Sequence, residues 1–100
     1  MTLVGVGGMR IQAMQPTERF VRDYKKLTAE QQSLVDDKLK ALLVNPRPPG
    51  LRFEKLKGYQ RPFIYTIHIT GNYKLSFEIV EGHIAVLRRI DTPDVIYRAP

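Results

Sequence analysis

The sequence predicts one α+β domain with the element order β-α-α-β-β-β, in which a small antiparallel sheet packs on a two-helix hairpin. Apolar residues recur at helical spacing up to residue 44, and they alternate with period two from residue 63 onward. A rigid connector, P-R-P-P-G, separates the two patterns. The chain has 100 residues, enough for one core. We expect a flexible, Gly-rich leader over 1–8 and a single domain over 9–100.

The first half of the chain predicts one strand followed by two helices. Residues 9–14 alternate apolar and polar side chains, which indicates a short strand. Pro16 suits the first turn of a helix. The apolar face of that helix comprises Phe20, Val21, Tyr24 and Leu27. Thr28 and Gln31 have the spacing of a capping box, so a second helix begins there and Asn45-Pro46 ends it.

The second half predicts three antiparallel strands, over 63–70, 73–80 and 84–90. For the first hairpin, a two-residue loop would pair apolar with polar side chains. A three-residue loop over 70–72 pairs Tyr65 with Phe77 and makes every pair on one face apolar, so we expect that register.

The register of the second hairpin predicts a row of basic side chains. A two-residue loop at Glu81-Gly82 places Arg89 opposite Lys74, and Lys74 already lies opposite His68. These three side chains would then share the sheet face away from the helices. Because like charges in a row repel one another, this arrangement favours an anionic ligand.

Composition limits the chemistry that the chain can perform. The chain has no cysteine, which excludes disulfides, thiol nucleophiles and thiolate zinc sites. His68 and His83 lack metal-ligand spacing, and no nucleotide-binding or signal-peptide pattern is present. The longest apolar runs, such as 41–44, have four residues, too few to span a bilayer. We expect a cytoplasmic protein without metal, cofactor or membrane contact.

The charge of the chain indicates a polyanionic partner. Sixteen Lys and Arg residues against ten Asp and Glu residues give a net charge of +6. The surplus is concentrated between residues 47 and 61. A basic surface of this kind commonly binds nucleic acid or an acidic protein, although a soluble protein can also simply be basic.

Several segments, in order along the chain, resemble the RelE/ParE toxin superfamily. They are F-V-R-D-Y-K-K-L at 20–27, N-P at 45–46, P-G-L at 49–51, E-K-L-K-G at 54–58 and L-R-R-I-D-T-P-D-V-I-Y-R at 87–98. The resemblance covers residues 9–98. It implies the toxin of a bacterial toxin–antitoxin pair, held inactive by a cognate antitoxin protein. Its RelE-like branch cuts messenger RNA, usually on the ribosome, and its ParE-like branch inhibits DNA gyrase.

The resemblance also implies a set of site residues. Metal-independent RNA cleavage needs a base for the ribose 2′-OH, cations for the phosphoryl oxygens and an acid for the leaving 5′-oxygen. The matching catalytic positions are Lys55, His68, Lys74, Arg89 and Tyr97. The expected RNA-binding residues are Arg52, Lys57, Arg61 and Arg88. Two positions depart from the pattern of the superfamily, because Asn72 replaces an aspartate and Pro93 replaces the histidine that would act as the acid.

We therefore expect an endoribonuclease that cleaves mRNA, with Tyr97 as the candidate proton donor in place of the missing histidine. Two alternatives remain at this point: a gyrase-inhibiting toxin, and a basic domain that binds nucleic acid without catalysis. The basic row favours the nuclease, whereas Pro93 favours a protein without catalytic activity.

Overall fold

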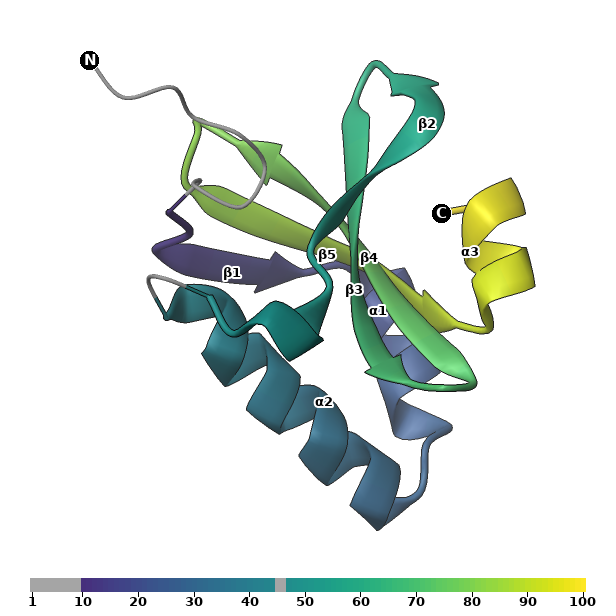
Figure 1. Ribbon diagram of the computed structural model, residues 1–100. Coiled ribbons are helices and arrows are strands. Elements are labelled where there is room, and N and C mark those ends of the chain that lie inside the picture. Colours follow the sequence, from purple (N-terminus) through teal and green to yellow (C-terminus); the bar gives the residue numbers. More distant parts are fainter. Residues whose placement is uncertain (1–9, 45–46) are drawn as a thin grey trace.

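The computed structural model describes residues 10–44 and 47–100 and shows the expected α+β class. Five strands form one sheet in the order β1-β5-β4-β3-β2. Their bounds are β1 Ala13–Pro16, β2 Glu54–Gln60, β3 Phe63–Thr70, β4 Tyr73–Val80 and β5 Ile84–Asp91. All neighbouring strands are antiparallel except β1 and β5, which are parallel (Figure 1).

Two helices, α1 (Glu18–Lys25) and α2 (Ala29–Leu43), form the expected helical hairpin. The capping box at the start of α2 is confirmed, because Thr28 Oγ1 accepts from the Gln31 N–H and the Gln31 side chain accepts from the Thr28 N–H. A short 3-10 turn, η2 (Pro49–Leu51), leads into the sheet. Among the described residues no helix is both long enough and apolar enough to cross a bilayer.

The start of the domain differs from the prediction. The first strand covers Ala13–Pro16 instead of 9–14, so Pro16 lies in a strand and Thr17 caps α1. Parallel pairing with β5 explains the shift, because the Thr17 N–H donates to the Leu87 carbonyl and the strand continues to the helix cap. The expected leader, Met9 and the Asn45-Pro46 helix stop lie outside the described residues.

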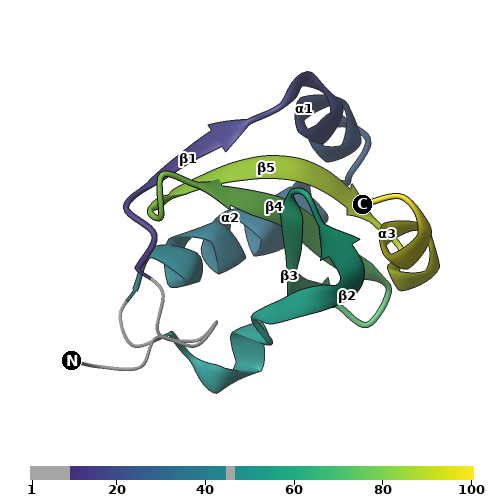
Figure 2. The ribbon, with the colours of Figure 1, turned by 90° about the horizontal axis from the view of Figure 1, so that it is seen from above.

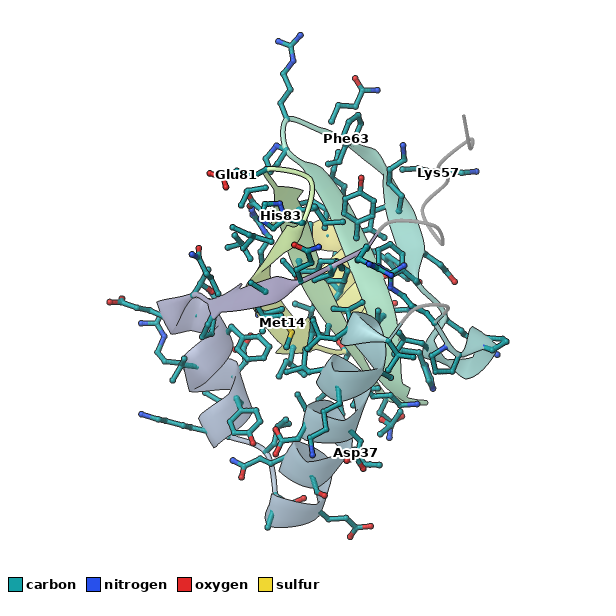
Figure 3. The ribbon with its side chains drawn as sticks, turned by 90° about the vertical axis from the view of Figure 1, so that its left-hand side faces the viewer. Met14, Asp37, Lys57, Phe63, Glu81 and His83 are labelled. Atoms are coloured by element: carbon teal, nitrogen blue, oxygen red, sulfur yellow. The ribbon has the colours of Figure 1, made fainter. Side chains whose placement is uncertain are left out.

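The core lies between this helical hairpin and one face of the sheet. Phe20, Val35 and Leu42 of the helices belong to the same buried cluster as Ile67, Leu75 and Phe77 of the sheet. Met14 of β1 is partly buried against this cluster (Figure 3). Burial of this face fixes the direction of every alternate side chain in β3 and β4, so the remaining side chains must point to the opposite face.

The register of the first hairpin is confirmed over most of its length. Tyr65 pairs with Phe77, Ile67 with Leu75 and His68 with Lys74. The expected three-residue loop is wrong: the ladder shifts by one residue between His68 and Thr70, so Thr70, not Ile69, pairs with Tyr73 and the loop has two residues, Gly71 and Asn72.

The predicted register of the second hairpin is wrong. Val80 pairs with Ile84, so the loop has three residues instead of two, and Glu81 and Gly82 both adopt left-handed backbone with φ of 54° and 76°. A second shift follows between Phe77 and Ser76. These two shifts place Asp91, not Arg89, opposite Lys74, and Arg89 lies opposite Ser76. The shifts keep Phe77 paired with Leu87 and Leu75 with Ile90, which preserves the buried apolar face.

The structure adds two elements to the predicted order. Strand β2 extends the sheet beyond β3, and a short helix, α3 (Pro93–Arg98), follows β5. Both views of the ribbon show α3 beside the β2–β3 hairpin and apart from α1 and α2 (Figures 1 and 2). Ile96 of α3 forms a second buried cluster with Leu56 of β2 and Ile64 of β3. We call this side of the sheet the α3 face.

Candidate functional site

The centre of the α3 face carries a row of three ionisable residues on neighbouring strands. The register aligns His68 of β3, Lys74 of β4 and Asp91 of β5. Their side chains share one face because directly paired residues on neighbouring strands point the same way. The row therefore contains a potential base, a cation and a carboxylate, rather than the three cationic groups that the sequence predicted.

Lys74 is a buried cation without a counter-ion. It is 8% exposed, and neither an ion pair nor a hydrogen bond from its ammonium group is found among the described residues. Its ammonium group makes a cation–π contact with Tyr97, whose ring centroid lies 5.9 Å from Nζ. Burial of an unpaired ammonium is costly, so an anion that binds here gains the full interaction with it.

His68 is held in its neutral form by its surroundings. Partial burial lowers the pKa of His68 below its ordinary value of 6.5, and the nearby positive charges of Arg52, Lys74 and Lys38 lower it further. A neutral imidazole can accept a proton at neutral pH. His68 therefore has the protonation state that a general base requires.

Tyr97 is positioned by the C-terminal helix. Pro93 occupies the first turn of α3, where proline is favoured. The hydroxyl of Tyr59 on β2 donates to the carbonyls of Tyr97 (2.9 Å) and Arg98 (3.2 Å), which ties α3 to the edge of the sheet. The side chain of Tyr97 remains 47% exposed and lines a hollow of about 320 Å³ together with residues 54–57 and Tyr59. The phenol is thus fixed in place and accessible to a ligand.

Arg89 does not join this group as an available cation. Its side chain is 12% exposed and forms ion pairs with Asp91 (2.8 Å) and with Asp23 of α1 (3.6 Å). One of its guanidinium nitrogens also donates to the carbonyl of Ala99. Asp23 in turn accepts from the backbone N–H of Ile90. Arg89 therefore links α1, β5 and the C-terminal segment, a role that the predicted register did not indicate.

Lys55 lies on the other face of the sheet. It pairs with Tyr65, whose side chain belongs to the helix-side core. Its ammonium group lies 4.6 Å from the ring centroid of Phe63. Lys55 is therefore absent from the row that contains Lys74, although it lines the same hollow as Tyr97.

The expected RNA-binding residues lie in three places. Arg61 and Arg88 line one large cleft on the α3 face. Arg52, which caps η2 with a left-handed backbone, lies close enough to His68 to lower its pKa. Lys57 is exposed and points outward from β2 (Figure 3). Asn72 is exposed in the β3–β4 turn, next to the row that contains His68.

Sequence reasoning missed Asp91, Tyr59 and Asp23 as parts of this site. Asp91 was hidden by the register error, because the longer loop at 81–83 and the irregularity in β5 together move it opposite Lys74. Tyr59 lies in a strand without apolar alternation, and the two partners of Asp23 on β5, Arg89 and Ile90, are more than 60 residues away along the chain. No group of three metal-ligating side chains is found within residues 10–44 and 47–100.

The comparisons with known proteins identify the fold. A chain of the Escherichia coli DinJ–YafQ toxin–antitoxin complex is 13% identical, with a TM-score of 0.68 over 89% of this chain and 98% of that chain. A chain of the RelB–RelE antitoxin–toxin complex from Methanococcus jannaschii is 22% identical, with a TM-score of 0.62 over 86% and 99%. This is the RelE-like toxin fold.

A third structure agrees with this identification. YoeB from Staphylococcus aureus, solved as a dimer, is 18% identical, with a TM-score of 0.61 over 82% of this chain and 95% of that chain. No protein-family model matches the sequence, and no curated protein does either. The RelE-like fold confirms the fold that the sequence resemblance implied.

Proposed function

We propose that this protein is the toxin of a bacterial type II toxin–antitoxin pair and a metal-independent endoribonuclease that cleaves mRNA in the cytoplasm, on the ribosome. A cognate antitoxin would hold it inactive. The observation that carries the proposal is Lys74, a buried cation without a counter-ion that lies beside an accessible phenol and a neutral imidazole. The RelE-like fold supports it, since two of the structures with this fold are toxin–antitoxin complexes.

The proposed reaction is attack of a ribose 2′-oxygen on the adjacent phosphate. His68 takes the proton of the 2′-OH, the 2′-oxygen forms a bond to phosphorus, and the bond from phosphorus to the 5′-oxygen breaks. Lys74 stabilises the charge that builds on the phosphoryl oxygens. The products are a 2′,3′-cyclic phosphate on one fragment and a 5′-hydroxyl on the other.

The proton for the leaving 5′-oxygen comes from Tyr97 in this proposal. A phenol is protonated at neutral pH and can donate. Pro93, which replaces the histidine of the superfamily, has no proton to give, but it begins the helix that carries Tyr97. The residue that departs from the superfamily pattern therefore contributes to placing the alternative proton donor.

Cleavage and gyrase inhibition can be measured on the same preparation. Purified protein is incubated with mRNA, with and without ribosomes, and cut sites are mapped by primer extension; a gyrase supercoiling assay runs in parallel. We expect discrete cuts in the mRNA and unchanged supercoiling. Inhibited supercoiling without cuts would establish the gyrase toxin instead, and RNA binding without either effect would indicate a non-catalytic domain.

A further inference from the structure

A second concave surface lies on the α3 face, next to the proposed reaction site. It is a cleft of about 920 Å³ between the β2–β3 turn, strands β4 and β5, the start of α1 and the end of the chain. Five arginines line it: Arg19, Arg61, Arg88, Arg89 and Arg98. Glu78 is its one acidic lining residue among those that the structure describes. We call this surface the arginine cleft.

Part of the charge in the arginine cleft is already neutralised. Arg88 forms an ion pair with Glu78, at 2.5 Å, Arg89 is paired with Asp91 and Asp23, and Arg19 is also paired with Asp23. In contrast, Arg61 and Arg98 form no ion pair with any residue in the described ranges, and both side chains are exposed. These two arginines therefore supply the uncompensated positive charge of the cleft.

Donors in the arginine cleft already hold oxygen atoms of the chain itself. Arg88 Nε donates to the carbonyl of Pro100 at 3.1 Å, and Arg89 Nη1 donates to the carbonyl of Ala99 at 3.0 Å. The hydroxyl of Ser76 also reaches the Pro100 carbonyl, at 3.4 Å. Two neighbouring oxygens at acceptor distance from two guanidinium groups show that the cleft has the geometry to bind a group rich in oxygen acceptors.

The arginine cleft adjoins the hollow that contains Tyr97. Tyr59 lines both concavities, and its hydroxyl is bonded to the backbone of α3. A strand with its reactive phosphate near Lys74 and Tyr97 would therefore continue past Tyr59 into the cleft. Guanidinium forks match phosphate oxygens in geometry, and all five basic side chains that line the cleft are arginines.

We propose that the arginine cleft binds phosphate groups of the RNA strand that flanks the cleaved bond, with Arg61 and Arg98 making the main contacts. This proposal rests on the proposed function for the identity of the ligand. An RNA strand fits better than an acidic protein segment because the cleft adjoins, at Tyr59, the hollow that contains Tyr97. The cleft is thus a subsite for affinity, separate from the residues that transfer protons.

The binding experiment uses an RNA that cannot be cut. A fluorescent 12-nucleotide 2′-O-methyl single strand is titrated by anisotropy at several NaCl concentrations, with the double variant Arg61→Gln/Arg98→Gln and the native protein. Each lost phosphate contact lowers the log–log salt slope by about 0.7 for single strands, so we expect a slope reduced by about 1.4 and binding at least about tenfold weaker. The matched control, Lys25→Gln/Lys26→Gln at the C-terminal end of α1, also removes two exposed charges and should leave both values unchanged.

Several outcomes would overturn the arginine cleft proposal. One is an unchanged log–log salt slope in the Arg61→Gln/Arg98→Gln variant. Another is an equal loss of RNA affinity in the Lys25→Gln/Lys26→Gln control, which would mean that only the net charge of the protein matters. A polyglutamate peptide that competes as well as the RNA and depends on Arg61 and Arg98 would assign the cleft to an acidic protein partner instead.

A cleavage assay separates this proposal from the proposed function. With a cleavable RNA, the Arg61→Gln/Arg98→Gln variant should show a raised KM and an unchanged kcat. If the native protein binds the uncleavable RNA through these arginines but cuts no RNA, the cleft stands and the nuclease proposal fails. If the native protein cuts RNA and the variant matches it in KM, the nuclease stands and the cleft proposal fails.

Discussion

Lys74→Met separates the functional role of this lysine from a structural one. Methionine preserves the length and most of the volume of the side chain while it removes the charge. Lys74 is 8% exposed and forms no ion pair among the described residues, so its replacement leaves no partner charge unsatisfied. Its contact with the ring of Tyr97 can persist, because a thioether also packs well against an aromatic ring.

The two expected effects of Lys74→Met differ in size. Loss of the cation–π contact costs about 0.5–2 kcal/mol, but the variant no longer buries an unpaired ammonium, which offsets that cost. The free energy of unfolding should therefore change by no more than about 1 kcal/mol. Removal of one group that stabilises transition-state charge typically lowers kcat by about 10²–10³-fold, or about 2.7–4 kcal/mol, and we expect a loss of that order.

Urea unfolding and single-turnover cleavage measure these two effects on the same protein. Lys25→Met on α1 is the control, because it removes an exposed lysine outside both concave surfaces and should change neither quantity. Full cleavage activity in Lys74→Met would refute the role of the buried cation. A variant that unfolds would show that Lys74 is a structural residue.

Three further changes test the remaining parts of the site. Tyr97→Phe should slow cleavage by about 10²–10⁴-fold with nearly unchanged RNA affinity, and normal single-turnover rates would mean that Tyr97 only packs the end of the chain. Because the pKa of His68 is lowered, the cleavage rate should fall as the pH falls, with a midpoint below 6.5. The pH profile of His68→Gln should lack that fall, and an unchanged profile would exclude His68 as the base. Asp23→Ala leaves the Ile90 N–H without its acceptor and Arg89 without one partner, so the free energy of unfolding in urea should fall by about 3 kcal/mol. Arg19→Ala, which removes only the exposed partner of Asp23, should lower it by less than about 1 kcal/mol. Equal losses in the two variants would contradict the linking role of Asp23.

The first β-hairpin of the meander could be predicted because its two strands alternate strictly. The matching of apolar with apolar side chains predicted the Tyr65–Phe77 and His68–Lys74 pairs, but not the shift before Thr70 that leaves a two-residue loop instead of three. The capping box at Thr28 was equally local, since both of its bonds lie within three residues. Interactions between residues that are close in the sequence could therefore be predicted.

The second hairpin depended on backbone geometry that the residue pattern does not reveal. Glu81 adopts a left-handed conformation that is uncommon for a residue other than glycine, and the shift near Arg88 adds one residue to β5. Together these two features place Asp91, instead of Arg89, opposite Lys74. The pairing of Arg89 with Asp23, across 66 positions of the chain, depends on how α1 crosses β5, which no local pattern specifies.

The most direct test of the central claim, that the α3 face cleaves RNA through Lys74 and Tyr97, is a map of RNA ends in cells. RNA fragments with 5′-hydroxyl ends are ligated and sequenced after a short induction of the native protein or of Lys74→Met. The proposed chemistry predicts new 5′-hydroxyl ends within coding regions for the native protein and their loss for Lys74→Met. Growth arrest by the native protein without such ends, or an equal number of ends from both proteins, would contradict the claim.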